Sequence, residues 1–555
     1  MFEHIILCFL LGSVVGYVDK ESPPQWSDVY TVKGTLNIPY AELHEPFYAW
    51  FDSKNGKSRI DYYGAMDKTY QLSSAAYPPY GTSIKIAPVT TEKVLNQQTC
   101  LQVNGSNDQL ISIQSVLPDM TDFKFVGTET MQDSDTSKWR MVMTVGDKIN
   151  KYTMWVKYRK VVKGDAIAIP VRYEMKGYNS LLGSHYDHYY IDYKNYDVEE
   201  IDQQVFTVDT SKFGLRCTSF PGPGATHLAT FNPMKEFVHP THDAHVHDEF
   251  ERFQLKHNKQ YNNHIELTKR QNIFRQNLRY IHSNNRARRG FTLAVNHLAD
   301  RTEDELVALR GRRYSGPNMG LPFPYDKTDV EEMSVKVPPE HDWRLFGAVT
   351  PVKDQSVCGS CWSFGTVGAV EGALFLHNGG HLVRLSQQAL VDCSWGFGNN
   401  GCDGGEDYRA YQWIMKHGLP TEEDYGGYLG QDGYCHIDNV TLVTSMKGWV
   451  NVTSGDEKAL RLAIFKHGPI SVAIDAAHKS FSFYSNGVYY EPKCKNKVDE
   501  LDHAVLAVGF GILNGQRYWL IKNSWSNMWG NDGYALMSSR DNNCGVETAP
   551  TYVLM

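Results

Sequence analysis

Hydrophobic and polar residues alternate along much of the N-terminal part of the chain, a pattern typical of half-buried β-strands. Every second residue from 152 to 158 is apolar or aromatic, and similar runs recur at 166–173 and 189–193. Asn55-Gly56 lies between two such runs, and this dipeptide is the strongest short signal for a β-hairpin. The pattern predicts an antiparallel β domain over residues 17–220.

Helical spacing replaces this alternation in two later segments. From 362 to 378 the apolar residues recur near helical spacing, and Gly379-Gly380 supplies a stop signal, so a helix should begin at or just after Cys361. From 250 to about 285 a polar segment also predicts a long helix. Six of its residues share one helical face, at intervals of three and four: Glu266, Arg270, Phe274, Asn277, Ile281 and Asn285.

Between these regions, Pro221-Gly-Pro-Gly224 begins a linker that we place at residues 221–249. Four histidines follow within nine residues, and they could bind a metal ion or sense acid: His239, His242, His245 and His247. Neither cysteines nor an ordered ligand spacing accompany them. We therefore expect a solvated linker, and no metal ion or cofactor.

Length and charge restrict the class of protein. A chain of 555 residues suggests three or four domains. The net charge is −8, with 55 Lys and Arg against 63 Asp and Glu, so no basic footprint argues for nucleic-acid binding. Inside the chain we find no apolar stretch of the roughly 18 residues that a membrane span needs.

The N-terminus resembles a secretory signal. Residues 5–15 are apolar, and cleavage near Gly16 would give a signal peptide over 1–16, although no Lys or Arg precedes the apolar run. Its removal would take Cys8 and leave nine of the ten cysteines. Eight of these can pair in an oxidising compartment, which leaves one free thiol, as a catalytic cysteine requires.

Three glycosylation acceptor sequences agree with secretion, at Asn104, Asn439 and Asn451. Cys100 and Cys217 are the only cysteines of the predicted β domain, so we expect them to form a disulfide.

Cys361 is the candidate nucleophile. At a helix N-terminus, exposed backbone N–H groups and the helix dipole favour the thiolate, which is the attacking form. The run from Cys358 to Trp362 fits the signature of the papain and cathepsin cysteine proteases. The stretches around His503 and Asn523 resemble that family's His and Asn motifs, and His503 follows Cys361 by 142 residues (503 − 361).

The resemblance covers roughly the last 310 residues. It implies an α+β, two-lobed peptidase domain over 337–555, with Cys361 on a helical lobe and His503 and Asn523 on a β-rich lobe. In it, Cys361 and His503 would act as an ion pair, and Asn523 would orient the imidazole. Two further roles are implied: Trp525 would shield the His–Asn contact and contribute to substrate binding, and Gln355 with the Cys361 N–H would form an oxyanion hole.

The six residues on one helical face resemble the Glu-Arg-Phe-Asn-Ile-Asn signature of cathepsin L-like zymogens. A second stretch resembles another motif of that propeptide through four alternating residues, Ala294, Asn296, Leu298 and Asp300. Ala294 and Leu298 stand where the family usually has Gly and Phe. The resemblance implies an inhibitory propeptide over 250–306 and an activation linker over 307–336. We expect acid to loosen the propeptide through carboxylates such as Glu266 and Asp300.

Spacing alone allows fifteen pairings of the remaining six cysteines. The family resemblance selects Cys358–Cys402, Cys393–Cys435 and Cys494–Cys544.

Gly404 and Gly405 resemble the stretch along which a substrate backbone pairs. Glu406 and Asp407 follow, where cathepsin L-like enzymes place apolar residues of the S2 pocket, and the small residues Ala504 and Ala549 would border the same pocket. Either a carboxylate faces inward and binds Arg or Lys at P2, or both side chains turn to solvent.

These patterns predict a lysosomal or secreted cysteine endopeptidase, made as a zymogen, whose partners are peptide and protein substrates and its own propeptide. The alternative is a catalytically silent scaffold with a ligand- or partner-binding N-terminal domain. That long extension resembles those of insect haemocyte cysteine proteases, whose extension looks like a half-barrel of the lipoprotein-carrier type. A further expectation is that the N-terminal domain associates with the mature protease after cleavage.

Overall fold

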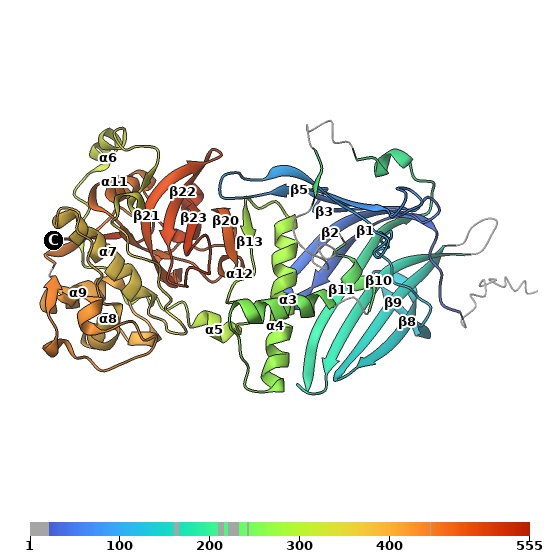
Figure 1. Ribbon diagram of the computed structural model, residues 1–555, viewed down its shortest axis with the longest axis horizontal. Coiled ribbons are helices and arrows are strands. Elements are labelled where there is room, and N and C mark those ends of the chain that lie inside the picture. The colour runs from blue at the N-terminus through green and yellow to red at the C-terminus, as the bar shows by residue number, and fades with distance from the viewer. Residues whose placement is uncertain (1–21, 160–165, 209–215, 220–231, 241–243, 445) are drawn as a thin grey trace, which may run out of the picture.

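A computed structural model describes residues 22–159, 166–208, 216–219, 232–240, 244–444 and 446–555. The expected signal peptide, residues 221–231 of the linker and His242 lie outside the described residues. The molecule is elongated, with a β-sheet domain at one end, the predicted peptidase domain (residues 337–555) at the other and two helices between them (Figure 1). Within the described residues, no helix combines the length and apolar character that crossing a membrane would require.

The N-terminal region is antiparallel, as predicted. One twelve-stranded sheet has the order β12-β6-β5-β4-β3-β2-β1-β11-β10-β9-β8-β7, and β12 joins β6 in parallel while the other neighbours are antiparallel. Asn55-Gly56 turns the chain between β2 and β3, and Gly56 has a φ of 64° that favours glycine. The strands are β1 (Val29–Ile38), β2 (Leu43–Asp52), β3 (Lys57–Tyr62), β4 (Asp67–Leu72), β5 (Thr82–Val89), β6 (Gln97–Asn104), β7 (Lys124–Met131), β8 (Ser134–Val145), β9 (Lys148–Arg159), β10 (Ile167–Asn179), β11 (Ser184–Asp197) and β12 (Thr218–Ser219).

The propeptide region contains two main helices rather than one. Around Asn258, whose φ is 49°, the chain leaves the first helix, and Asn263 caps the second by accepting from the Glu266 N–H. Part of the expected linker is helical as well. The elements are α2 (Lys235–Val238), α3 (Ala244–Lys256), α4 (His264–Arg286), β13 (Phe291–Leu293), α5 (Glu303–Val307), β14 (Leu321–Pro322) and α6 (Lys327–Ser334).

One face of α4 holds the propeptide together. Arg270 contacts Glu266 at 2.6 Å and also pairs with Glu305 on α5. Asn277 donates to the Ala299 carbonyl at 2.9 Å, and Asn285 exchanges two hydrogen bonds with Leu293. The face predicted from helical spacing is thus the one that carries the internal contacts of the propeptide.

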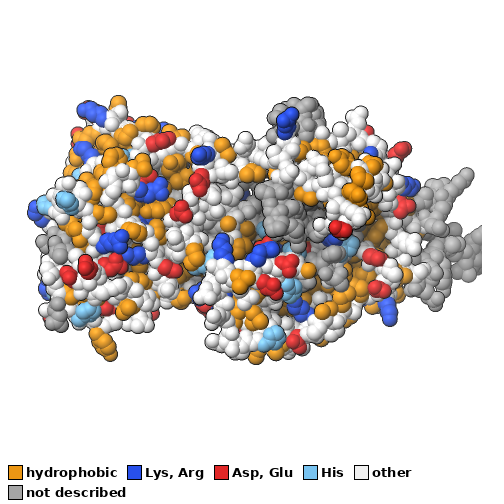
Figure 2. Space-filling model, in the orientation of Figure 1, with side chains coloured by type: hydrophobic (Ala, Val, Ile, Leu, Met, Phe, Trp, Pro, Cys, Tyr) orange, Lys and Arg blue, Asp and Glu red, His pale blue; other side chains and the backbone are white. Residues whose placement is uncertain are grey.

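Other α4 side chains bind the N-terminal sheet through two buried arginines. Arg279 contacts both carboxylate oxygens of Asp187 on β11, at 2.7 and 2.9 Å, and Glu236 on α2 at 2.7 Å. Arg286 contacts both oxygens of Glu45 on β2, at 2.6 and 2.8 Å. Charged side chains of both signs also gather on the surface over α3 and α4 (Figure 2). Desolvated ion pairs therefore join the sheet to the propeptide helix.

The peptidase domain has a helical lobe around α7 and a β-rich lobe around β21. Its sheet has the order β13-β20-β23-β22-β21-β19-β24-β18-β14, with β15 paired to β21, so propeptide and linker strands extend both ends. The helices are α7 (Cys361–His377), α8 (Gln387–Cys393), α9 (Asp407–His417), α10 (Glu422–Tyr425), α11 (Glu457–His467) and α12 (Lys479–Ser482). The strands are β15 (His341–Asp342), β16 (Leu419–Pro420), β17 (Leu442–Thr444), β18 (Gly448–Asn451), β19 (Ile470–Ile474), β20 (Tyr484–Tyr489), β21 (His503–Leu513), β22 (Gln516–Lys522), β23 (Tyr534–Ser538) and β24 (Thr551–Leu554).

Four disulfides are present, with the partners expected from the sequence: Cys100–Cys217, Cys358–Cys402, Cys393–Cys435 and Cys494–Cys544. Among the described residues Cys361 is the free cysteine, and it is buried.

Glu45→Ala should destabilise the junction between the sheet and α4. The substitution leaves Arg286 buried without its partner, which typically costs about 3–5 kcal/mol. Asp192→Ala is the matched control, because it breaks the Arg172–Asp192 pair of the same geometry at a more exposed site, where such pairs contribute about 0–1 kcal/mol. Hydrogen exchange in the precursor would measure the first loss at β2 and α4 and the second at β10 and β11. Equal loss of protection in the two variants would contradict this account.

Candidate active site

The candidate site lies where α7 meets β21. Cys361 is the first residue of α7 and His503 the first of β21. The helix can lie close to the strand because Gly368 has no side chain. A Cβ there would be 2.6 Å from the Leu506 side chain, too close for any other residue to fit without a shift. The fold therefore brings together two residues that are far apart in the sequence, and the Ala504 N–H, next to His503, donates to the Cys361 Sγ at 3.5 Å.

Asn523 fixes the orientation of the imidazole. The His503 Nε2 and Asn523 Oδ1 atoms are 2.8 Å apart, and the Trp525 ring centroid lies 4.8 Å from that of His503. An amide oxygen can only accept, so Nε2 carries the proton in this contact, and Nδ1 is the ring atom left to exchange one. Since Trp525 is 2% exposed, it keeps water from the contact.

Gln355 is completely buried, and its amide points to a carbonyl of the linker. Its Nε2 donates to the Leu309 oxygen at 3.0 Å and to the Cys358 oxygen at 2.7 Å, and its Oε1 accepts from the Ser524 hydroxyl at 2.6 Å. Ser524 thus determines which end of the amide faces the cleft. The sequence reasoning missed this residue, because adjacency to Asn523 was its only signal.

Residues 309–313 of the linker fill the cleft. The Gly405 N–H donates to the Gly311 carbonyl at 2.9 Å and the Arg313 N–H donates to the Gly405 carbonyl at 3.1 Å, which makes a parallel bridge around Arg312. A Cβ at Gly311 would stand 1.7 Å from the Gly359 oxygen, so only glycine fits there. The linker therefore covers Cys361 and excludes water from it.

Burial changes the protonation of the Cys–His pair. It raises the pKa of the Cys361 thiol to about 11, although N–H groups of Ala504 and Gly311 oppose the shift. Burial also lowers the pKa of His503 to about 4, against the hydrogen bond to Asn523 and helped by the nearby Arg310 guanidinium. The ion pair expected from the sequence is thus disfavoured in the precursor, because the linker has removed the water that would solvate it.

Beyond Cys361 lies a pocket of about 610 Å³. Its lining includes four residues expected at S2, namely Glu406, Asp407, Ala504 and Ala549. Gly404 and Gly405 lie along the linker instead, and a Cβ at Gly404 would be 2.5 Å from the Gly311 oxygen. Trp525 lines a different cavity, beside the N-terminal domain. The structure therefore groups the four pocket residues and separates Trp525 from them.

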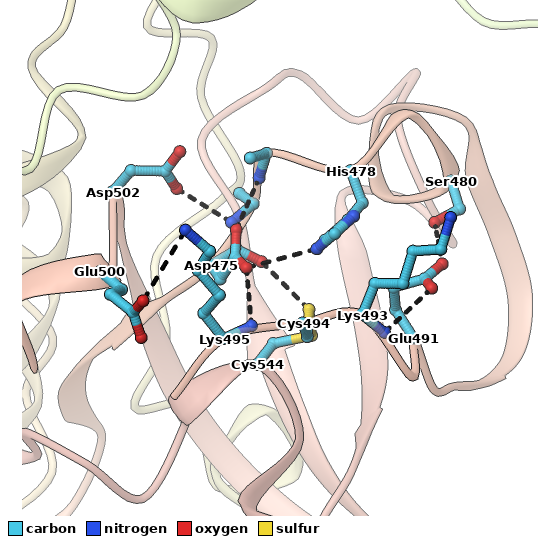
Figure 3. A network of polar contacts seen from close by, with 12 residues as sticks. Asp475, His478, Ser480, Glu491, Lys493, Cys494, Lys495, Glu500, Asp502 and Cys544 are labelled. Carbon is cyan, nitrogen blue, oxygen red and sulfur yellow. Dashed lines mark hydrogen bonds and ion pairs between the residues drawn. A yellow bond between two sulfur atoms is a disulfide. The ribbon is translucent and has the colours of Figure 1, made fainter. Parts of the chain in front are cut away.

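A polar network braces the chain that leads into His503 (Figure 3). The Asp475 carboxylate accepts from the Lys495 N–H at 2.8 Å and from His478 at 3.3 Å, and Asp502 accepts from the Ala476 N–H at 2.9 Å. Asp475, His478 and Cys494 bring potential metal-ligand atoms within 4.8 Å of one another. Cys494 is bonded to Cys544, so it offers no thiolate, and we interpret the cluster as structural.

The glycosylation candidates differ in their surroundings. Asn104 is exposed, while the Asn451 amide donates to the linker carbonyls of Asn318 and Gly320, at 3.2 and 3.4 Å. A glycan on Asn451 would displace these contacts. The Asn439 side chain lies outside the described part of the chain.

Comparisons with known proteins agree with this geometry. The family model described as papain family cysteine protease matches residues 337–554, and that described as cathepsin propeptide inhibitor domain (I29) matches residues 250–306. A cathepsin L-like peptidase of Aedes aegypti is 44% identical over 321 residues, which make up 56% of this chain and 94% of that protein. The chain belongs to the papain family of cysteine proteases.

Two further relatives of this papain-family protein are digestive enzymes. Digestive cysteine proteinase 2 of Homarus americanus is 43% identical over 312 residues, covering 55% of this chain and 94% of that protein. The solved structure of digestive procathepsin L2 proteinase from the Tenebrio molitor larval midgut is 34% identical, with a TM-score of 0.52, covering 56% of this chain and 100% of that chain. These findings confirm the papain-like α+β fold, the inhibitory propeptide and the hydrolase class.

Ser524→Ala should lower kcat with little change in KM, because the Gln355 amide loses the hydroxyl that orients it. Removing an oxyanion donor outright, as in Gln355→Ala, typically costs about 10²–10³ in kcat, and the loss in Ser524→Ala should be smaller. Ser526→Ala is the control, since that hydroxyl contacts Asn527 instead. Steady-state kinetics on the activated enzyme would measure the series. A Ser524→Ala enzyme with unchanged kcat would refute the role of Ser524.

Proposed function

We propose that the protein is the zymogen of a cysteine endopeptidase in which Cys361 is the nucleophile and His503 the acid–base group. Asn523 orients the imidazole, and Gln355 with the Cys361 N–H stabilises the oxyanion. The observation that carries the proposal is the Leu309 carbonyl, which accepts from Gln355 beside the buried free thiol, as the carbonyl of a bound substrate would.

The chemistry follows from removal of the linker. Once water re-enters the cleft, charged groups are solvated, and the N-terminus of α7 favours a thiolate at Cys361. The thiolate then adds to the substrate carbonyl carbon, and protonated His503 gives its proton to the departing amine. Neutral His503 then takes a proton from water, which attacks the acyl-enzyme, and this step releases the acid and restores the thiolate beside protonated His503.

Covalent labelling tests this assignment. After acid activation, a thiol-directed epoxide peptide should modify wild-type protein at Cys361 and fail to modify Cys361→Ala. Asn523→Ala should keep partial turnover, because only the orientation of His503 is lost. Absence of labelling in activated wild type would favour the alternative, a silent protease-like scaffold.

We also propose that the precursor enters the secretory pathway and reaches a lysosome or the extracellular space. The support is the apolar N-terminal segment, the four disulfides and the exposed sequon at Asn104. The substrates of the enzyme would be peptides and proteins, and residues 250–336 of the same chain would act as its inhibitor.

The N-terminal domain, in this proposal, braces the inhibitor helix. Its buried ion pairs through Glu45 and Asp187 are with α4. Among the described residues, the ion pair that joins it directly to the peptidase domain, Glu42 with Lys479, spans 4.0 Å and involves an exposed carboxylate. Association of this domain with the mature protease would therefore depend on α4 remaining in place. Size-exclusion chromatography after activation tests this, and co-elution of the two domains after α4 has been degraded would contradict it.

Acid activation should depend on propeptide histidines whose pKa is lowered in the precursor, among them His297, which is buried, and His257, which is half-buried. Burial lowers the pKa of His297 to about 3, and it lowers that of His257, with Lys256 and Lys259 adding to the shift. A neutral buried histidine contributes stability that is lost as pH falls from about 6.5 toward the folded value, by up to about 1.4 kcal/mol per pH unit. The propeptide should therefore loosen in this window.

His297→Gln should shift activation of the purified precursor to lower pH, because the substituted side chain takes up no proton. His381→Gln, at an exposed site of the peptidase domain, is the control. The carboxylates expected to respond form ion pairs, Glu266 with Arg270 and Asp300 with Lys259. Burial of Glu305 is outweighed by hydrogen bonds from Arg270 and Thr302, which hold its pKa at about 2, so this contact survives at about pH 4–5. Identical activation profiles for His297→Gln and wild type would refute the histidine mechanism.

A further inference from the structure

The pocket beyond Cys361 contains a buried carboxylate that faces inward. Glu406 is 3% exposed and stands just before α9, where its N–H donates to the Asn399 side chain at 2.9 Å. Asp407 is held differently, because its Oδ2 accepts from the hydroxyls of Ser471 and Thr551, both at 2.8 Å. Adjacent acidic residues therefore have different surroundings, and only Glu406 is directed to the linker.

The linker places a guanidinium against Glu406. Arg312 is 8% exposed, and its Nη2 lies 3.2 Å from the Glu406 Oε1. Its Nη1 donates to the carbonyls of Val498 and Leu501, both at 2.8 Å. The pocket thus offers one carboxylate and two carbonyl oxygens, a set of acceptors that suits the planar fork of an arginine.

The second oxygen of Glu406 is also bound by the linker. Oε2 accepts from the Ser315 N–H at 2.8 Å and from the Ser315 hydroxyl, which also contacts the Tyr408 hydroxyl of the peptidase domain. Departure of the linker removes Arg312 and Ser315 together. It leaves a carboxylate in a pocket whose other walls include Val472, Ala504 and Ala549, and an unpaired charge in such surroundings is unfavourable.

We propose that Glu406, supported by the charge of Asp407, makes this pocket a cation site that selects Arg, and more weakly Lys, at P2 of the substrate. This inference rests on the proposed endopeptidase function. A guanidinium restores the contacts that Arg312 makes in the precursor, whereas the Lys ammonium reaches Glu406 without the same fit to both carbonyls. Two cations of the peptidase domain lie near Glu406. Lys497 stands at the pocket's edge, where its exposed position lets solvent screen it, and the Arg409 Nε lies 3.2 Å from the Ser315 hydroxyl in an exposed contact.

Fluorogenic peptides that differ only at P2 test the proposal, with Arg, Lys, citrulline or Leu at that position. Citrulline has the shape of arginine without its charge, so wild type should prefer Arg to citrulline. Glu406→Gln should lower the Arg-to-Leu ratio of kcat/KM by about 10- to 100-fold. Asp407→Asn should lower it less, and Glu423→Gln, at an exposed site outside the pocket, should leave it unchanged.

Active-site labelling with the epoxide peptide normalises every variant to its folded, competent fraction. An unchanged Arg-to-Leu ratio in Glu406→Gln would overturn the proposal, as would a loss confined to Asp407→Asn or equal turnover of Arg and citrulline. Failure of the proposed function has a different signature, since wild type would then turn over none of the four peptides and take up no epoxide.

Discussion

Exclusion of water from the cleft is the constraint on which the rest of the site depends. Gly311 lies so close to Gly359 that no other residue fits, and the segment around it seals Cys361 and His503 from solvent. In that environment the neutral thiol and neutral imidazole are favoured, so the linker suppresses the reactive charge state as well as access. The same seal explains why Arg312 is needed, because the linker that buries Glu406 must also supply a cation for it.

Helix α4 connects the propeptide, whose linker covers the cleft, to the N-terminal domain. Its residues Phe274 and Ile281 pack in the propeptide, while Arg279 and Arg286 pair with carboxylates of the sheet. A polar helix of this kind owes most of its stability to packing rather than to propensity. Contacts from both sides therefore stabilise the inhibitor, and loss of either would weaken the fold that presents the linker to the cleft.

The spacing of apolar residues along the chain predicted the helices and strands whose position depends on neighbouring residues alone. The start of α7 at Cys361 and the propeptide face of α4 follow from helical periodicity, and the strand alternation located β9. Burial by distant segments could not be read in this way. Nothing in β2 marks Glu45 as the partner of a residue 241 positions later, and adjacent acidic residues gave no sign that Glu406 would face the linker while Asp407 bound hydroxyls.

Acid acts with opposite sign on the two sides of the cleft. The hydrogen bond to Asp475 raises the pKa of His478, so this pair contributes stability that is present below the ordinary histidine pKa and is lost as pH rises through the folded value. On the propeptide side, the stability that neutral, buried His297 contributes to the fold is lost as pH falls below the ordinary histidine pKa. The Arg289 guanidinium outweighs burial and lowers the pKa of Glu491, so that this bridge to the propeptide weakens only when pH falls below the usual carboxyl range. We therefore expect acidification to loosen the inhibitor while the contact between Asp475 and His478 gains stability, so that one change of pH would separate two parts that are folded together at neutrality.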